Sequence, residues 1–259
     1  MKIAPAPLTR ALACLVFTLL INAAPAAVIL WNPVSTISGD SDVSTAGSLV
    51  NAFNVGGLGN ATVGGITFTA TTVDAVTTGT LGTGSGALTL QASTTWFGNL
   101  GAIFGSASAP FSSLSAGYQS LLNTLAYSAS SSATYTMQGL VIGQAYLVQF
   151  WLNDSRGSDT TFGRYNQFTA GNLSGNVDVN ALNAVGGVGQ FVIGTFVADA
   201  TTQAVNVAAG FVAPSTSSVI QLNGYQLRAI PEPSVAVLLT GSLLTLVLRR
   251  RRSVRSGIA

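Results

Sequence analysis

The side chains in this sequence that could do chemistry are mainly aspartates in two short polar segments. Asp40 and Asp42 flank a serine, while Asp154 and Asp159 follow an apolar stretch that ends at Leu152. Carboxylates in loops rich in Gly and Ser suit calcium, which prefers oxygen ligands. Neither segment has the bidentate Glu of an EF-hand loop, and the same residue types also favour Asx turns. Each segment is therefore either a calcium site or a plain turn.

Catalysis needs reactive side chains that the centre of this sequence lacks. The chain has no His, which excludes a Ser-His-Asp triad. Its one cysteine is Cys14 and its one lysine is Lys2, so a disulfide framework and a Cys/His metal site are excluded from the centre. Asp154 and Asp159 could form a glycosidase pair, but the nearby Arg156 favours ionised Asp154 and opposes its use as a general acid. We expect no enzyme, no catalytic residue and no cofactor, with calcium as the only option.

Aromatic residues beside polar ones are the second kind of candidate. An exposed aromatic ring can stack on a sugar ring while its neighbours hydrogen-bond to the hydroxyls. Trp96, near Asn99, and Tyr165, beside Arg164, are the candidates for such a carbohydrate contact. The alternative is that both rings pack in the core, as most aromatic side chains do.

Charge is scarce and unevenly placed. Charged residues are 7% of the 259 residues and the net charge is +2, but five arginines lie in the last eleven positions. The centre keeps Arg156, Arg164 and Arg228 against seven aspartates. It is therefore mildly acidic, and we expect no nucleic-acid partner.

The N-terminus has the three parts of a secretory signal peptide. Lys2 and Arg10 precede an apolar run over residues 11–21, and Ala24 and Ala26 form a small-x-small cleavage site. The run is short for a membrane anchor. We predict export by the general machinery and removal of residues 1–26 by signal peptidase.

The C-terminus also has three parts. Pro231, Glu232 and Pro233 precede an uncharged apolar run over residues 234–248. Four basic residues follow directly, namely Arg249, Arg250, Arg251 and Arg252. Snorkelling arginine stems lengthen the apolar segment enough for a transmembrane helix. The positive-inside rule keeps the arginines cytoplasmic and places the preceding domain outside.

This order of tripeptide, apolar run and arginine stop resembles the PEP-CTERM sorting signal. The resemblance covers about the last thirty residues, in which Pro231, Glu232 and Pro233 match the tripeptide that gives the family its name. It implies recognition by an exosortase, an inner-membrane intermediate and cleavage near the tripeptide. It also implies a bacterium that makes exopolysaccharide, often in a biofilm. An ordinary tail anchor is the alternative.

Residues 27–230, between the two signals, read as one all-β domain. Short apolar runs alternate with turn residues, which predicts an antiparallel, jelly-roll-like β-sandwich. A hairpin is expected over residues 61–68, with its turn at Gly64 and Gly65. The other expected strands are 28–31, 87–91, 133–138, 145–152, 164–169, 190–197, 203–212 and 219–228, the last with a bulge at Gly224. One short helix is expected over residues 115–127, where Tyr118, Leu121, Leu122 and Leu125 have helical spacing.

Three functions are compatible with these features. We rank first a non-enzymatic surface or extracellular-matrix protein with a structural or adhesive role. A carbohydrate-binding module acting on exopolysaccharide ranks second, and an aspartate-dependent glycoside hydrolase ranks last. The first two differ in whether aromatic and polar side chains converge on an exposed groove.

Overall fold

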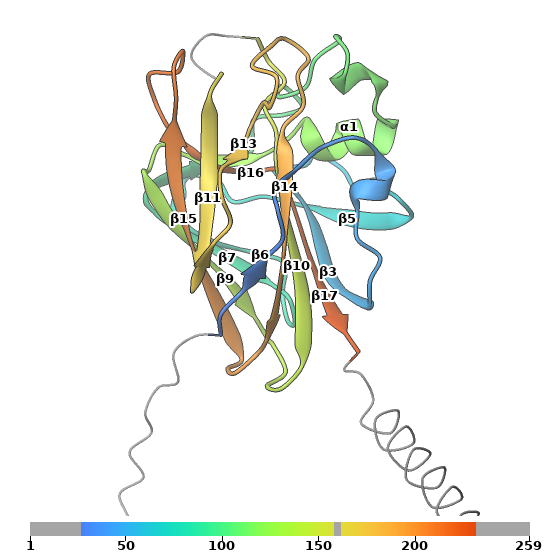
Figure 1. The fold of residues 1–259 in the computed structure, drawn as a ribbon, viewed down its shortest axis with the longest axis vertical. Helices are drawn as coiled ribbons and strands as arrows, with labels where there is room; N and C mark the ends of the chain where they lie inside the picture. The colour runs from blue at the N-terminus through green and yellow to red at the C-terminus, as the bar shows by residue number, and fades with distance from the viewer. Residues whose placement is uncertain (1–26, 158–161, 232–259) are drawn as a thin grey trace, which may run out of the picture.

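The short apolar runs of this chain form strands, and the strands assemble into two sheets (Figure 1). The structure is a computed structural model that describes residues 27–157 and 162–231. The predicted signal peptide with Ala24 and Ala26, Asp159, and the sorting segment from Glu232 onward lie outside the described residues. Within them, the expectation of an all-β sandwich with one short helix is confirmed.

The first sheet has eight strands within the described residues. Their hydrogen-bonded order is β1 (Leu30–Trp31), β14 (Gln190–Val197), β10 (Ala145–Leu152), β17 (Gly224–Ile230), β3 (Ser48–Val55), β5 (Ile66–Thr71) and β4 (Ala61–Val63), with β2 (Ser35–Thr36) also paired to β14. The β3–β5 pair is parallel, so the expectation of a fully antiparallel sandwich is wrong there. The reason is the tight turn at Gly64 and Gly65, which have positive φ values and fold β5 back between β4 and β3.

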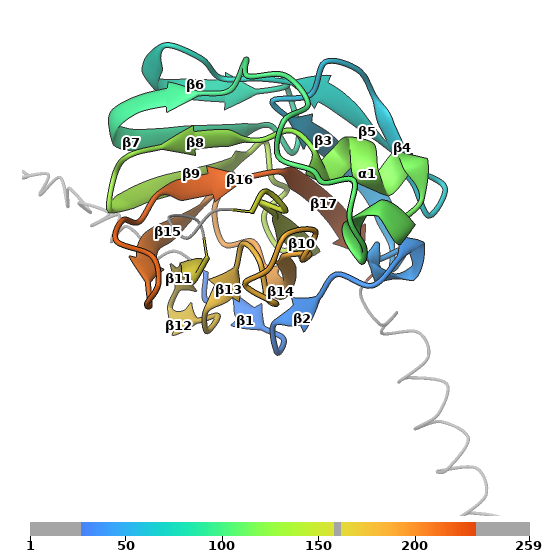
Figure 2. The same ribbon diagram turned by 90° about the horizontal axis from the view of Figure 1, so that it is seen from above.

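The second sheet has nine strands in the same part of the chain. Their order is β12 (Asn172–Leu173), β11 (Arg164–Ala170), β15 (Thr202–Phe211), β9 (Ser132–Gln138), β7 (Leu88–Phe97), β8 (Ala126–Ser128) and β16 (Ile220–Leu222), with β13 (Val177–Asp178) on β11 and β6 (Val76–Leu81) on β7. Figure 2 shows the two sheets as facing layers.

Between the sheets lies a core rich in aromatic side chains. Tyr135, Phe150, Phe168 and Tyr225 are fully buried, and the rings of Phe150 and Phe168 stack at a centroid distance of 4.9 Å. Inward-facing residues alternate with outward-facing ones along each strand, as β-sandwich packing requires. Burial of each such side chain stabilises the fold by about 1.5–3 kcal/mol.

A second core lies on the outer side of the first sheet, under the helix α1 (Ala116–Leu122). Tyr118 and Leu121 of this helix pack with Trp151 of β10 and Phe68 of β5. The helix begins at Ser115, whose hydroxyl accepts a hydrogen bond from the Tyr118 N–H at 3.2 Å. It ends at Leu122 rather than at residue 127 as predicted, because Ala126–Ser128 pair with β16 as strand β8.

The last predicted strand, 219–228, changes sheet at Asn223. Residues before it form β16 in the second sheet, and residues after it form β17 in the centre of the first sheet. The predicted bulge at Gly224 is therefore a crossing between layers, and the register shift lies between Leu227 and Arg228. This crossing joins the two sheets along one side of the sandwich.

Both ends of the described domain leave from the same end of the sandwich (Figure 1). Ile230, at the end of β17, lies opposite Ala145 at the start of β10. The N–H of Ile29 donates to the carbonyl of Ala170, at the end of β11. The segment that follows β10 and the start of β11 are therefore at the opposite end, roughly 25 Å away at about 3.3 Å per residue.

No helix among residues 27–157 and 162–231 is long and apolar enough to cross a membrane.

Candidate ligand-binding site

A pocket of about 350 Å³ lies at the end of the sandwich opposite the chain ends. The segment after β7, strand β8, the segment after β10, the start of β11 and strand β16 each contribute to its wall. Its apolar lining is Leu100, Ile103, Phe104, Leu125, Tyr127 and Val219, and its polar lining is Asp154, Arg156, Arg164 and Gln221. The volume lies within the range of about 300–1,000 Å³ that is usual for small-ligand sites.

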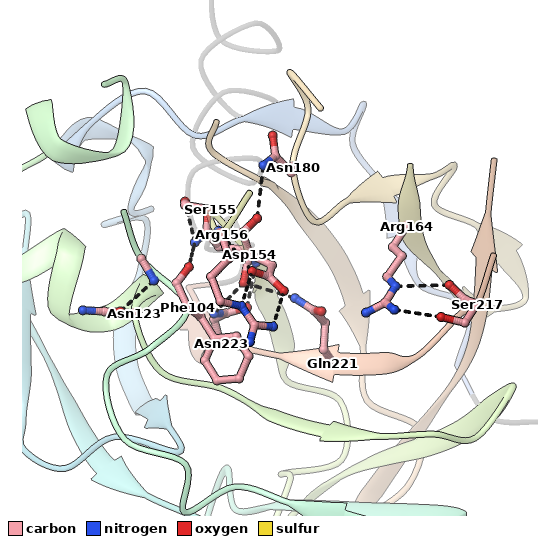
Figure 3. A network of polar contacts seen from close by, with 12 residues as sticks. Phe104, Asn123, Asp154, Ser155, Arg156, Arg164, Asn180, Ser217, Gln221 and Asn223 are labelled. Atoms are coloured by element: carbon pink, nitrogen blue, oxygen red, sulfur yellow. Dashed lines mark hydrogen bonds and ion pairs between the residues drawn. The ribbon is translucent and has the colours of Figure 1, made fainter. Parts of the chain in front are cut away.

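An ion pair between Asp154 and Arg156 forms one side of the pocket (Figure 3). The Arg156 Nε and Nη2 donate to the two carboxylate oxygens at 2.9 and 2.7 Å, in a bidentate arrangement. The guanidinium carbon lies 4.2 Å from the centre of the Phe104 ring, a cation–π contact. Asp154 is 1% exposed, so its charge is compensated almost entirely by Arg156. The hydrogen bonds that the Arg156 guanidinium donates to the Asp154 carboxylate raise the pKa of Arg156.

Buried amides hold this ion pair in place. The Asn153 side chain donates to the carbonyls of Phe104 and Leu122 at 3.4 and 3.2 Å. Its Oδ1 accepts from the Gly189 N–H at 2.9 Å. The Asn180 amide donates to the Asp154 carbonyl at 3.1 Å. These hydrogen bonds hold the backbone of Asn153 and Asp154 in place. They also give the buried polar groups of this segment their partners.

Arg164 occupies the other side of the pocket. Its Nε and Nη2 donate to the carbonyl and hydroxyl of Ser217 at 3.1 and 2.8 Å. Among the described residues it has no carboxylate partner within ion-pair distance. Half-burial lowers the pKa of Arg164, with a further lowering by Arg156 and an opposing effect of Asp154. Arg164 is thus a fixed cation paired with a neutral side chain.

Gln221 lies between the Asp154–Arg156 ion pair and Arg164 (Figure 3), and its side chain is 2% exposed. Its amide donates to the Asn153 carbonyl at 3.2 Å, and among the described residues its Oε1 accepts no hydrogen bond. Tyr127 adds an aromatic face, and its ring lies 5.4 Å from that of Phe97, which is 40% exposed. Such a pocket can hold a small ligand with one apolar face and several polar groups.

The pocket does not form a glycosidase site in the described residues. Glycoside hydrolysis uses two carboxyl groups that flank the bond to be cut. Asp154 is the only carboxylate that lines the pocket in the described part of the chain, and it is held by Arg156. Its predicted partner, Asp159, lies outside the described residues.

Asp40 and Asp42 do not line the pocket and lie in a 3₁₀ turn over Asp40–Asp42 that contacts helix α1. The Asp42 carboxylate accepts from the N–H groups of Ser38 and Gly39 at 2.6 and 3.0 Å and from the Tyr118 hydroxyl at 3.2 Å. Asp40 accepts from the Ser115 hydroxyl at 2.6 Å. These contacts connect the turn to the start of α1 and match the turn interpretation of this segment. No group of three or more His, Cys, Asp or Glu side chains that could hold a metal occurs in the described residues.

The prediction that Trp96 contacts carbohydrate is wrong. Its side chain is fully buried between the sheets, 6.1 Å from the Tyr135 ring. The alternation of β7 directs Trp96 inward and Phe97 outward, so the neighbouring residue has the exposed ring. Tyr165 is partly exposed on the outer face of the second sheet, over Gly210, and does not line the pocket.

Sequence reasoning missed Tyr127, Phe104 and Gln221 as site residues, and it used Arg164 only as a neighbour of Tyr165. Two of the three arginines of the domain follow the strand 145–152 closely, in a region with few charges. That clustering was the available signal. The contribution of Phe104 and Gln221 could not be read from the sequence, because it depends on the loop after β7 and on the crossing at Asn223.

No protein-family profile matches this chain, and no curated protein sequence matches it. Among solved structures, the plant receptor-like kinase ANX1 matches with a TM-score of 0.45 and 12% identity, over 71% of this chain and 49% of that one. The ANXUR1 extracellular domain from Arabidopsis thaliana matches with a TM-score of 0.43 and 15% identity, over the same shares. The ANX2 ectodomain from Arabidopsis thaliana matches with a TM-score of 0.41 and 18% identity, over 71% and 50%. This chain thus spans about half the length of these plant chains.

Proposed function

We propose that this protein is a non-enzymatic surface or matrix protein whose sandwich binds a saccharide residue of exopolysaccharide. The observation that carries the proposal is the pocket itself. There, Tyr127 and Phe104 converge with Arg156, Arg164 and Gln221 in a space of small-ligand size. This is the convergence of aromatic and polar groups that separates a binding module from a purely structural domain.

The terminal sequences support an exported, anchored protein. Residues 1–26 have the pattern of a signal peptide, and residues 231–259 have the PEP-CTERM order of tripeptide, apolar run and arginines. We propose signal peptidase and an exosortase as processing partners and a transmembrane helix over residues 234–248 in the intermediate. The final location is the cell surface or matrix. We also propose that the sandwich is of the jelly-roll type.

The position of the pocket is consistent with this role. The chain leaves the domain at Ile230, beside Ala145, while Asp154 and Arg156 follow the other end of β10. A domain held through its C-terminal segment would therefore present the pocket away from the membrane, where a matrix polymer is found.

The test is binding of exopolysaccharide purified from the native host. We expect the full-length chain, kept in mild detergent, to co-sediment with the polymer. A Tyr127→Ala change should weaken binding about 10-fold, because truncating a central aromatic contact typically costs more than 1 kcal/mol. Tyr165→Ala is the matched control, since it removes a partly exposed tyrosine outside the pocket. Absence of binding, or loss with Tyr165→Ala alone, would contradict the proposed site.

A further inference from the structure

The pocket is richer in arginine than the rest of the described domain. The described residues contain three arginines and six aspartates, and two of the arginines but one aspartate line the pocket. Among the described lining residues, two guanidinium groups and one carboxylate give a net charge of +1, whereas the rest of the described domain has one arginine and five aspartates. An anionic ligand is therefore attracted to this site and to few other places on the surface.

Among the described residues, the charge without an opposite partner in this pocket is that of Arg164. Both oxygens of the Asp154 carboxylate accept hydrogen bonds from Arg156. Arg164 is half-buried, yet the groups that it contacts, the carbonyl and hydroxyl of Ser217, are neutral. Removing a cation from water is costly unless an opposite charge compensates it. An anion in the pocket would supply that compensation.

The geometry leaves donors for such an anion. Nε and Nη2 of Arg164 bind Ser217 and fix the guanidinium plane, while Nη1 has no hydrogen-bond partner among residues 27–157 and 162–231. The same holds for Nη1 of Arg156. A guanidinium that is already oriented loses less conformational entropy when it binds an oxyanion. The ligand group that fits is a small oxyanion with a single charge.

The other half of the ligand is a polyol. Gln221 is nearly fully buried, and its Oε1 accepts no hydrogen bond from residues 27–157 or 162–231, in the same pocket as Arg164 (Figure 3). A sugar hydroxyl could donate to it. The ring of Tyr127 and the exposed side chain of Ile103 supply an apolar face for the C–H side of a sugar ring, whereas the ring of Phe104 is covered by Arg156. These groups lie in one pocket with the two arginines.

We propose that the pocket selects a saccharide residue that carries one negative charge, with the anion at Nη1 of Arg164 and a hydroxyl at Oε1 of Gln221. This inference rests on the proposed function and defines its ligand class. The charge can come from a uronic acid carboxylate or from a sulfate ester, since both are oxyanions of the same charge.

The experiment compares the host exopolysaccharide in its native form, after reduction of carboxylates to alcohols, and after removal of sulfate esters. The full-length chain in mild detergent is titrated with each polymer. We expect one of the two treatments to weaken binding about 10-fold or more, as loss of a hydrogen bond to a charged group does. The treatment that weakens binding identifies the source of the charge. These polymer comparisons do not depend on the folding of any variant.

Arg164→Gln should weaken binding of the native polymer by a similar factor and reduce its sensitivity to salt. Ala200→Asp is the matched control, because it lowers the net charge by the same unit at an exposed turn near the opposite end of the sandwich. Ala200→Asp should change the affinity for the polymer less than about twofold, because the distance between residue 200 and the pocket exceeds the Debye length of about 10 Å. Thermal midpoints of both variants confirm that they fold.

The outcomes separate the two proposals. Equal binding of native, carboxyl-reduced and desulfated polymers would overturn the anionic ligand and leave exopolysaccharide binding in place. Equal weakening by Arg164→Gln and Ala200→Asp would overturn the role of Arg164. Failure of the native polymer to bind at all would overturn the proposed function and this inference together.

Discussion

Asn153 and Asn223 hydrogen-bond to each other reciprocally where the two sheets join. The Asn153 N–H donates to Oδ1 of Asn223 at 2.7 Å, and Nδ2 of Asn223 donates to the Asn153 carbonyl at 3.1 Å. The Asn223 amide also donates to the carbonyls of Leu122 and Thr124 at 3.0 and 2.9 Å. One buried side chain thus connects the end of β10, the end of α1 and the strand crossing.

Replacing Asn223 by Ala should lower the free energy of unfolding by about 2–4 kcal/mol. The change removes the partners of the buried Asn153 N–H and of the Thr124 carbonyl, while the Leu122 and Asn153 carbonyls keep a second donor. Each buried group left without a partner costs about 1–3 kcal/mol. Chemical denaturation measures the loss. The control is Asn206→Ala, on the exposed face of β15, which should change stability by less than about 0.5 kcal/mol. Similar losses in both variants would contradict a special role for Asn223.

Tyr118→Phe should lower the free energy of unfolding by about 1–3 kcal/mol, even though the change removes only one oxygen atom. The Tyr118 hydroxyl accepts from Trp151 Nε1 at 2.9 Å and donates to Asp42 at 3.2 Å. Without it the buried indole N–H has no partner, which costs its full desolvation free energy. Thermal unfolding of the variant is the measurement. An unchanged midpoint would mean that this chain of hydrogen bonds does not contribute to stability.

The protein should lose stability above about pH 10, the usual tyrosine pKa. Burial raises the pKa values of Tyr118, Tyr135 and Tyr225 above this range, and Asp42 raises that of Tyr118 further. As pH rises through 10, the unfolded chain releases these protons while the folded protein keeps them. The unfolded state then binds fewer protons, so stability falls. Absorbance of tyrosinate should show that at least these three tyrosines ionise only on unfolding. Ionisation of all six in the folded protein would exclude this.

Calcium should leave the thermal midpoint of the protein unchanged. The carboxylates of Asp40 and Asp42 already accept hydrogen bonds from Ser38, Gly39, Ser115 and Tyr118. A cation that bound the folded state alone would raise the midpoint with its concentration. Melting curves in millimolar calcium and in excess chelator test this, and a higher midpoint in calcium would restore the cation site.

Processing should remove both terminal segments. We expect surface material from the native host to begin at Ala27 and to end near residues 231–233, because those segments match signal-peptide and sorting patterns. Intact-mass measurement of the extracellular protein gives both ends at once. A mass that includes Met1 would contradict signal cleavage, and one that includes Ala259 would contradict sorting.

Strands with strong local alternation were predictable from the sequence, whereas their partners were not. The bounds 145–152 and 190–197 match β10 and β14, because these apolar runs are bounded by turn residues. Strands β3 and β6 were missed, since Ser, Asn, Thr and Gly interrupt their apolar pattern. The sequence placed Arg156 near Asp154, and the two side chains form an ion pair, which is a local effect of residues two positions apart. The pocket is formed by residues more than a hundred positions apart in the sequence, such as Phe104 and Gln221. A local sequence pattern does not show that such distant residues meet.

The place of β17 in the sheet would determine when the domain can fold during the export that we propose. This strand is the last element of the described domain, yet it lies in the centre of the first sheet, between β10 and β3. A chain that emerges with its N-terminus first cannot complete that sheet until residue 230 has crossed the membrane. We therefore expect the domain to remain unfolded through most of its passage and to close in one late step. That order suits the export that we propose, because a translocation channel needs an unfolded chain.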